Sequence, residues 1–271
     1  MAVLIRALVL NAGSSSLKCD LYEVPPDAPI AAPEAVFHSQ LDWDESTGGI
    51  DSAVAEALTR LGADRIDAMG HRVVHGGARF RESVIVDDAV RGAIEELCES
   101  APLHNPLALA AIRAIDRLRP GIPQIAVFDT AFHNTIPPAA FTYPGPHDWL
   151  DRGIRKYGFH GISHRYVARR AAELLGRDLS LLRIVTAHLG GGCSLCAVSG
   201  GRSVETTMGF TPLDGLMMGT RSGAVDPGIL LHLLQRDGES PDALAKTLQH
   251  ESGLRGLSGV SSDMRAVMAA A

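Results

Sequence analysis

The chain has 271 residues, enough for two modest domains, since one domain usually takes roughly 100 to 200 residues. Its formal net charge of -6 comes from interspersed acidic and basic residues, which excludes a broad basic face for nucleic acid and a polybasic segment for a membrane surface. Arg6 interrupts the apolar opening MAVLIRALVL, so we interpret this stretch as the first core strand and expect no transmembrane span. The four scattered cysteines predict a reducing compartment, the cytoplasm.

The first feature along the chain is residues 8 to 22, LVLNAGSSSLKCDLY, which predict a strand, a tight turn and a second strand. The small turn residues let backbone N–H groups and hydroxyls gather around an anion, and Lys18 adds a positive charge. The pattern therefore indicates a phosphate cradle on a hairpin. It differs from G-x-x-x-x-G-K-[ST], which leads from a strand into a helix. An ordinary serine-rich hairpin is the alternative that these residues leave open.

The rest of the chain alternates helical and strand patterns. Amphipathic periodicity predicts helices near 51 to 61, 87 to 99, 163 to 175 and 241 to 250, and two further helices that Asn105-Pro106 and Asp226-Pro227 open as N-cap and first-turn pairs. Short apolar runs predict strands at 71 to 75, 124 to 128 and 183 to 189. The fold class is therefore α/β.

Residues 183 to 201, RIVTAHLGGGCSLCAVSGG, repeat the plan of the opening hairpin, with Ser194 and Leu195 in the places of Ser16 and Leu17. Two copies of a strand-turn-strand unit predict a duplicated domain, with the two turns facing each other across a ligand cleft. We place the domains at residues 1 to 150 and 151 to 271. Chance recurrence of glycine-rich hairpins is the alternative.

Several stretches carry charged side chains at the ends of predicted strands, where α/β proteins place their sites. Arg72 lies within an apolar strand and needs a partner or a ligand, Asp129 ends a strand, and Arg221 lies between two glycines. Together with a lysine, a histidine and two phosphate-sized turns, these residues suit phosphoryl transfer, in which one well-placed arginine contributes about 10³ to 10⁵ in rate.

Metal and redox sites are weaker interpretations. The i, i+4 pairs His71/His75 and His160/His164 lack the cysteine or glutamate of a zinc set, and we expect structural roles for His71, His104 and His164. Cys193 and Cys196 form a C-x-x-C, but it lies in a glycine turn that enters a strand, without a second pair.

Seven segments, in the same order along the chain, resemble the signature segments of the acetate kinases: NAGSSSLK, GHRVVHGG, APLHNP, VFDTAFH, YGFHGISH, HLGGG and TTMGFTPLDGLMMGTRSG. GLSGVSSDMR, at residues 256 to 265, extends the resemblance. The resemblance implies two duplicated ribonuclease H-like domains of the actin-like ATPase fold, with a nucleotide cleft between them. It also implies reversible transfer of the γ-phosphoryl group of ATP to acetate, giving acetyl phosphate and ADP, with Mg²⁺, or alternatively Mn²⁺.

Site residues follow from the same resemblance, position by position. It implies that Arg72 and Arg221 bind acetate and the transferring phosphoryl group, that His160 stabilises this group, and that Asp129 orients the arginine and metal-bound water. Asn11 would stand at the metal. The acetate methyl pocket would consist of Val74, Leu103, Phe159 and Pro212. The phosphate and nucleotide contacts would come from Ser14, Ser16, Lys18, His188, Gly190, Gly191, Gly192, Asp263 and Arg265.

The chain departs from the family pattern at three points. Gly191 and Ala224 stand where members carry Asn and commonly Asp, and the sequence stops at Ala271, whereas the family pattern runs on for about a third of its length again. We expect the chain to be a fragment, a truncated reading or a natural short form. If the 271 residues are the whole protein, we therefore expect weak or absent kinase activity and an incomplete second domain. A propionate or butyrate kinase of the same family, or an inactive nucleotide-fold module, is the alternative. The resemblance also suggests a cytoplasmic homodimer.

Overall fold

The computed structural model describes residues 4–13, 15–26, 33–44, 46, 48–62, 65–99, 101–102 and 104–271. The chain folds as two compact units, unit 1 (Met1–Ala131) and unit 2 (Phe132–Ala271). This division falls earlier than the predicted domain boundary after residue 150. The short 3₁₀ helix η2 (Ala131–Thr135) carries the chain into unit 2, because His133 and Thr135 both bond to Ser203 there.

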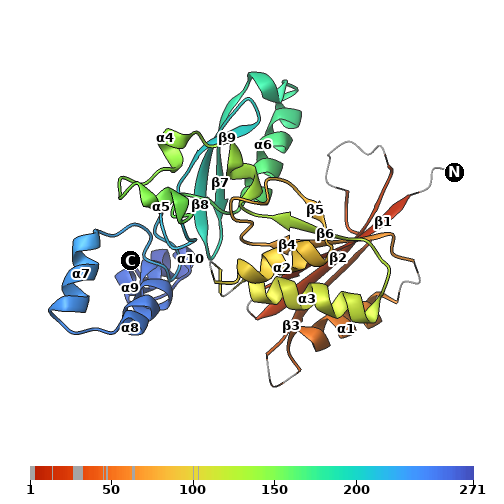
Figure 1. Ribbon diagram of the computed structural model, residues 1–271, viewed down its shortest axis with the longest axis horizontal. Helices are drawn as coiled ribbons and strands as arrows, with labels where there is room; N and C mark the ends of the chain where they lie inside the picture. Colours follow the sequence, from red (N-terminus) through yellow and green to blue (C-terminus); the bar gives the residue numbers. More distant parts are fainter. Residues whose placement is uncertain are drawn as a thin grey trace. The chain divides into compact units, whose positions relative to one another are not determined.

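Unit 1 contains a mixed sheet in which the described residues form six strands, in the order β3-β2-β1-β4-β6-β5 (Figure 1). β1, β4 and β6 are mutually parallel, whereas β2, β3 and β5 run antiparallel to their neighbours. The bounds are β1 (Ile5–Ala12), β2 (Ser16–Val24), β3 (Phe37–Asp42), β4 (Ala68–Val73), β5 (Val84–Ile85) and β6 (Gln124–Phe128).

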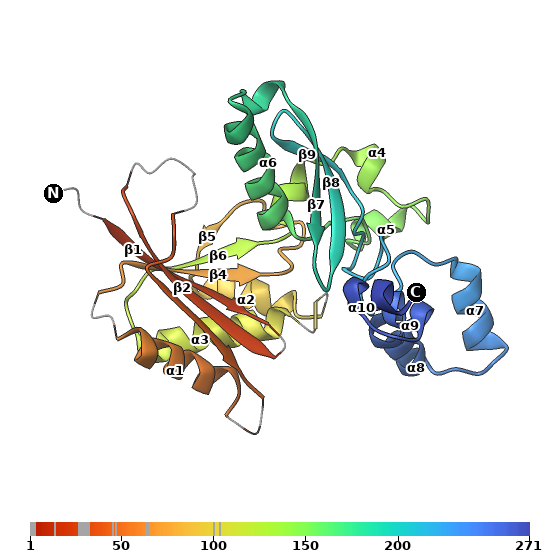
Figure 2. The same cartoon turned by 180° about the vertical axis from the view of Figure 1, so that it is seen from behind.

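Helices α1 (Gly49–Leu61), α2 (Asp88–Glu96) and α3 (Asn105–Leu118) belong to the same unit, and α1 and α3 pack on the sheet (Figure 2). The buried side chains of α1 recur with helical spacing and form a core with the inward side of β1 and β2: Ile50, Ala53, Val54, Ala57 and Leu58. The prediction of Asn105 as an N-cap is wrong by one residue, since His104 occupies that position. Asn105 is fully buried, and its side chain bonds to the backbone of His75.

Unit 2 contains an antiparallel sheet whose described strands are β7 (Arg183–Leu189), β8 (Cys193–Ser199) and β9 (Arg202–Thr206). Helix α6 (Gly161–Leu175) lies along this sheet in both views (Figures 1 and 2). Ala168 of α6 is buried against Cys196 and Val198 of β8. Cys196 and Val198 face the helix because alternate strand residues share one face.

The remaining elements of unit 2 are short: α4 (Pro138–Phe141), α5 (Asp148–Asp151), η3 (Leu179–Leu181), α7 (Pro227–Gln235), α8 (Pro241–Lys246), a π-helical turn (Thr247–Glu251), α9 (Gly253–Ser258) and α10 (Met264–Ala270). Asp226 caps α7 as predicted, through Gly228 N–H. The helix predicted over 241 to 250 ends at Lys246 and continues as the π-helical turn. Within the part of the chain that the structure describes, no helix has the length and apolar character needed to cross a membrane.

Both predicted hairpins are confirmed. In unit 1, β1 and β2 pair from Ile5↔Val24 to Ala12↔Leu17, and in unit 2, β7 and β8 pair from Arg183↔Ser199 to Leu189↔Cys193. Each unit therefore carries an antiparallel hairpin as part of its sheet. The strand-turn-strand repeat is a property of the fold as well as of the sequence.

Candidate active site

Arg72 is the centre of a polar cluster at one edge of the unit 1 sheet. It lies near the C-terminal end of β4, and Asp129 follows the neighbouring strand β6. Arg72 donates to Oδ2 of Asp129 from Nη2 (2.6 Å) and Nε (3.1 Å), and from Nη1 to Oδ1 of Asn11 on β1 (3.2 Å). The C-terminal ends of parallel strands meet at one edge of a sheet, which brings these three side chains together. We call Arg72, Asp129 and Asn11 the Arg72 cluster.

The two charges of this cluster are buried to different extents. The Asp129 side chain is 2% exposed, whereas the Arg72 side chain is 34% exposed. Burial alone would lower the pKa of Arg72, but the attraction and hydrogen bonds of Asp129 outweigh it and the pKa is raised. The guanidinium is thus a fixed cation that is held from the inside by a carboxylate and remains accessible on its outer edge.

The opening hairpin places a second cation, Lys18, beside Asn11 of the Arg72 cluster. Lys18 on β2 lies directly opposite Asn11 on β1, and residues opposite each other in an antiparallel pair share one face. Lys18 is exposed, and the turn before it is closed by a hydrogen bond from Gly13 N–H to the Ser16 carbonyl (2.8 Å). Ser14, the remaining predicted phosphate contact of this turn, lies outside the described residues.

The backbone beyond Arg72 is fixed by two buried side chains. The Asn105 amide bonds to both the N–H and the carbonyl of His75 (3.0 Å each), and Thr130 Oγ1 accepts from Gly76 N–H (2.9 Å). Gly76 has to be glycine, because a Cβ there would lie 2.9 Å from the Phe128 ring. Val74, a predicted pocket residue, is buried in this segment, and its predicted partner Leu103 lies outside the described residues.

In unit 2, His160 stands at the N-cap of α6 with φ +59°, the one positive φ of a non-glycine residue among those described. Such a conformation persists only where neighbours enforce it. His133 does so, because its Nε2 lies 2.9 Å from the Phe159 carbonyl and its Nδ1 lies 2.9 Å from Ser203 Oγ. Gly158 adds a tight approach, since a Cβ there would lie 2.5 Å from Thr206 Cγ2.

His160 shares its surroundings with Arg221 and the glycine turn at residues 190 to 192. A Cβ on Gly192 would lie 3.5 Å from His160 Nε2 and 3.6 Å from Arg221 Nη1, so both nitrogens approach one point beside the turn. His188, at the end of β7, stacks on the His160 ring with centroids 4.0 Å apart. We call His160, His188, Arg221 and this turn the His160 cluster.

Arg221 is held differently from Arg72. Its Nη1 donates to the Pro212 carbonyl at 3.3 Å, and burial lowers its pKa. Among the residues that the structure describes, no carboxylate forms a salt bridge with Arg221. A partly buried guanidinium without a carboxylate partner is suited to an anionic ligand. This hydrogen bond places Pro212, a predicted pocket residue, beside Arg221. Phe159, another predicted pocket residue, is buried and directly precedes His160 in the chain.

Asp263 and Arg265, predicted beside the adenosine, form an exposed ion pair at the N-terminus of α10 (2.6 Å). The hydrogen bond from Arg265 is the main cause that lowers the pKa of Asp263 to about 2. The preceding Ser262 carbonyl lies 3.3 Å from where a Cβ on Gly219 would be, and Gly219 N–H donates to the Gly191 carbonyl (3.3 Å). The start of α10 therefore lies close to the glycine turn.

Among the described residues, no group of three His, Cys, Asp or Glu side chains is placed so that it could hold a metal ion. Cys193 and Cys196 lie on β8, and burial is the main cause that raises the pKa of Cys196 to about 11. His75 lies beyond the end of β4, so it does not extend the strand face that carries His71.

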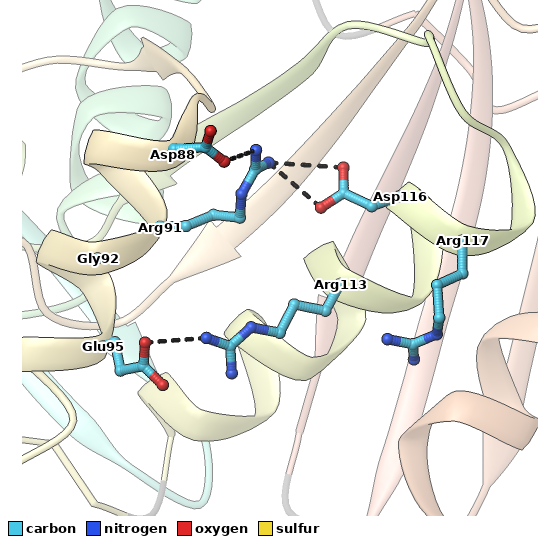
Figure 3. Close-up of a pocket in the computed structure, with 7 residues that line it drawn as sticks. All are labelled: Asp88, Arg91, Gly92, Glu95, Arg113, Asp116 and Arg117. Carbon is cyan, nitrogen blue, oxygen red and sulfur yellow. Dashed lines mark hydrogen bonds and ion pairs between the residues drawn. The ribbon is translucent and has the colours of Figure 1, made fainter.

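A separate surface pocket lies between α2 and α3 (Figure 3), lined by Asp88, Arg91, Gly92, Glu95, Arg113, Asp116 and Arg117. Its arginines are already engaged, since Arg91 bonds to Asp88 (2.6 Å) and Asp116 (3.2 Å) and Arg113 bonds to Glu95 (2.9 Å). These contacts tie the two helices together and leave the pocket without a concentrated charge of one sign.

Four buried residues near His160 were not assigned to the site from the sequence: His133, Thr186, Ser194 and His164. For His164 the sequence analysis expected a structural role. The His160/His164 spacing was a signal, since the N-cap and the fourth residue of the helix lie one turn apart, and His164 N–H donates to the His160 carbonyl (2.9 Å). Nothing in the sequence indicated that Ser194 and Thr186 would meet these histidines. They come from strands β7 and β8, and the contacts depend on how α6 packs on the sheet.

Comparisons with known proteins agree with these observations. Residues 6–271 match the model of the acetokinase family. The chain is 51% identical to the acetate kinase of Gloeobacter violaceus, over 96% of this chain and 72% of that protein, and 49% identical to the acetate kinase of a Nostoc species, over 98% and 73%.

Solved structures show the same relationship. The crystal structure of Porphyromonas gingivalis acetate kinase matches with a TM-score of 0.86 at 39% identity, covering 98% of this chain and 73% of that one. A propionate kinase from Francisella tularensis matches with the same TM-score at 36% identity and the same coverage. The α/β fold is therefore that of these kinases, which agrees with the predicted actin-like ATPase fold.

Proposed function

Because this chain belongs to the acetokinase family, we propose that it is an acetate kinase that transfers the γ-phosphoryl group of ATP reversibly to acetate, giving acetyl phosphate and ADP. The observation that carries the proposal is the approach of His160 Nε2 and Arg221 Nη1 to one point beside the glycine turn. In the forward reaction a carboxylate oxygen of acetate attacks the γ-phosphorus while the bond to the leaving ADP oxygen breaks. The charge on the equatorial oxygens has to be neutralised during this step.

Each cation has a role that follows from its surroundings. Arg221, which has no carboxylate partner among the described residues, binds the transferring phosphoryl group, and His160 donates a hydrogen bond to it. Arg72, already neutralised on its inner edge by Asp129, binds the acetate carboxylate with its exposed edge. Lys18 and Ser16 of the opening hairpin and the backbone N–H groups of the glycine turn contact the nucleotide phosphates.

A divalent metal accompanies the nucleotide in this family, and we propose Mg²⁺, with Mn²⁺ as the alternative. The oxygen atoms of Asn11 and Asp129 stand at one sheet edge, held by Arg72. A site with one carboxylate and one amide fits Mg²⁺, which usually keeps several waters and binds substrate phosphates through one or two carboxylates. Asn11 and Asp129 would hold the ion directly or through water, and the ion would neutralise phosphate charge.

We propose that Val74, Leu103, Phe159 and Pro212 surround the acetate methyl group. A pocket of this kind discriminates one methylene by about 1 to 3 kcal/mol, or roughly 10- to 200-fold. Propionate is the second candidate substrate, because one of the two solved structures described above is a propionate kinase.

The substrate is tested by comparing acetate, propionate and butyrate as acceptors, with the acyl phosphate trapped by hydroxylamine. We expect kcat/KM to fall at least about 10-fold with each added methylene. A higher kcat/KM for propionate than for acetate would assign the chain to the propionate kinases. Binding of acyl phosphate without turnover would favour the inactive nucleotide-fold module.

The remaining proposals rest on the family alone. We propose a homodimer formed through unit 2 and a location in the cytoplasm, and that Asp263 and Arg265 contact the adenosine. Sedimentation velocity over a range of protein concentrations tests the dimer, and a single species of monomer mass at all concentrations would contradict it. An Asp263→Ala variant with unchanged KM for ATP would contradict the adenosine contact.

A further inference from the structure

One buried hydroxyl connects two histidines of unit 2. Ser194 on β8 is 0% exposed, and its Oγ lies 2.8 Å from Nδ1 of His160 and 2.8 Å from Nε2 of His164. A serine hydroxyl has one proton to donate and can accept from the other side. Ser194 therefore donates to one of the two rings and accepts from the other, and the direction of this choice determines which nitrogen of His160 carries its proton.

The direction follows from the far end of the network. Thr186 Oγ1 lies 2.8 Å from Nδ1 of His164 and donates to the Cys196 carbonyl at 3.4 Å. A carbonyl only accepts, so both contacts of Thr186 are hydrogen bonds only when its single proton points to Cys196 and its oxygen accepts from His164 Nδ1–H. Burial is the main cause that lowers the pKa of His164 to about 4, which leaves the ring neutral near pH 7, with one proton.

With that proton on Nδ1, Nε2 of His164 is an acceptor, and Ser194 donates to it. The Ser194 oxygen then accepts from Nδ1–H of His160. We propose that Ser194 and His164 are positioning residues that hold His160 with its proton on Nδ1 and its Nε2 directed at the glycine turn. This inference rests on the proposed function only in that it makes His160 the group that meets the phosphoryl oxygens.

The geometry on the other side of the ring agrees. His160 Nε2 is the nitrogen that lies 3.5 Å from the point where a Cβ on Gly192 would be. The ring plane is supported by the stacked His188, whose Nδ1 lies 2.9 Å from Ser163 Oγ. Because Ser194 holds the proton of His160 on Nδ1, Nε2 has to take up a second proton before it can donate a hydrogen bond to a phosphoryl oxygen, and Nδ1–H still donates to Ser194 in that cationic form.

A buried polar cluster that only stabilises the fold would show the same distances, so the test reads the tautomer of His160 directly. Long-range proton–nitrogen correlation spectra of the 271-residue chain labelled with nitrogen-15 histidine, at mildly alkaline pH, distinguish a protonated Nδ1 from a protonated Nε2. We expect a pyrrole-type Nδ1 and a pyridine-type Nε2 for His160. The reverse assignment in the unaltered chain would overturn the inference.

Two matched substitutions extend the test. Ser194→Ala removes the hydroxyl, and we expect His160 to lose its preference for Nδ1–H. Thr186→Val removes the far hydroxyl and keeps the side-chain shape, whereas Thr186→Ser keeps the hydroxyl. We expect the tautomer to change in Thr186→Val and to be retained in Thr186→Ser. An unchanged His160 spectrum in both folded Ser194→Ala and folded Thr186→Val would overturn the inference.

Kinetics separate this inference from the proposed function. For Ser194→Ala we expect kcat to fall by about 10- to 100-fold, the loss typical when a group that orients a functional side chain is removed, with the KM for acetate unchanged. Absence of kinase turnover in the unaltered chain, with His160 still in the Nδ1–H form, would refute the function and support the positioning. Full turnover in Ser194→Ala would support the function and refute the positioning.

Discussion

Because Arg72 and Asp129 are buried to different extents, we expect their substitutions to lower the free energy of unfolding by different amounts. In Arg72→Met the Asp129 carboxylate, 2% exposed, loses its partner, and a buried unpaired charge of this kind costs about 3 to 5 kcal/mol. In Asp129→Asn the guanidinium is 34% exposed and regains water, so we expect a loss of about 1 to 2 kcal/mol. In the double variant no buried charge is left unpaired, so the loss should be smaller than in Arg72→Met alone.

The assay follows unit 1 by itself. The chain has two tryptophans, Trp43 in unit 1 and Trp149 in unit 2, so urea unfolding in a Trp149→Phe background reports unit 1 through Trp43 fluorescence. The exposed pair Arg60/Glu56 is the matched control, for which the same double-mutant cycle should give less than about 1 kcal/mol. If Arg72→Met cost no more than Asp129→Asn, the argument from burial would be wrong.

Three further outcomes are expected. Burial lowers the pKa of His71, His75, His133 and His164 from 6.5 to about 4, so the unfolded chain binds more protons than the folded chain between these pH values. The free energy of unfolding should therefore be highest above pH 6.5 and fall as the pH falls toward 4, by up to about 1.4 kcal/mol per pH unit for each histidine. An unfolding free energy independent of pH over this range would contradict the burial of the four histidines. Gly158→Ala should lower the unfolding free energy measured through Trp149 by about 2 kcal/mol or more, because the new Cβ would clash with Thr206. Gly49→Ala should cost less in unit 1, because Gly49 also has a positive φ but a Cβ there would meet nothing within 4 Å. Equal losses in the two variants would refute the steric effect at Gly158. Gly191→Asn, where a Cβ meets nothing within 4 Å, should lower the KM for ATP by about 10-fold through one added hydrogen bond to phosphate, and an unchanged KM would show that the backbone already supplies this contact.

Much of the architecture could be predicted from local patterns. The hairpins follow from alternating apolar residues around glycine turns, and α1 and α7 follow from helical periodicity and an Asp-Pro start. Arg72 was expected to need a partner because it lies in an apolar strand, and the structure supplies Asp129 and Asn11. These features depend on residues close in sequence or on neighbouring strands.

The features that were not predicted depend on contacts between distant segments. Asn105 precedes a proline as an N-cap would, but its amide is used by the backbone of His75, thirty positions away. Ser194 follows the pattern of an ordinary strand residue, and only the packing of α6 on β8 brings it between His160 and His164. A buried polar group takes whichever partner the tertiary fold provides, and sequence spacing does not specify that partner.

Phosphoryl transfer that depends on Arg221 is tested most directly by ATP formation from acetyl phosphate and ADP with Mg²⁺, measured on the 271-residue chain and on its Arg221→Ala variant. We expect ATP formation by the unaltered chain and a rate at least about 10³-fold lower in the variant, because a cation that neutralises the transferring phosphoryl group is removed. Equal rates in the two proteins, or no ATP from a folded sample of the unaltered chain, would contradict the proposed role of Arg221 and the proposed kinase activity.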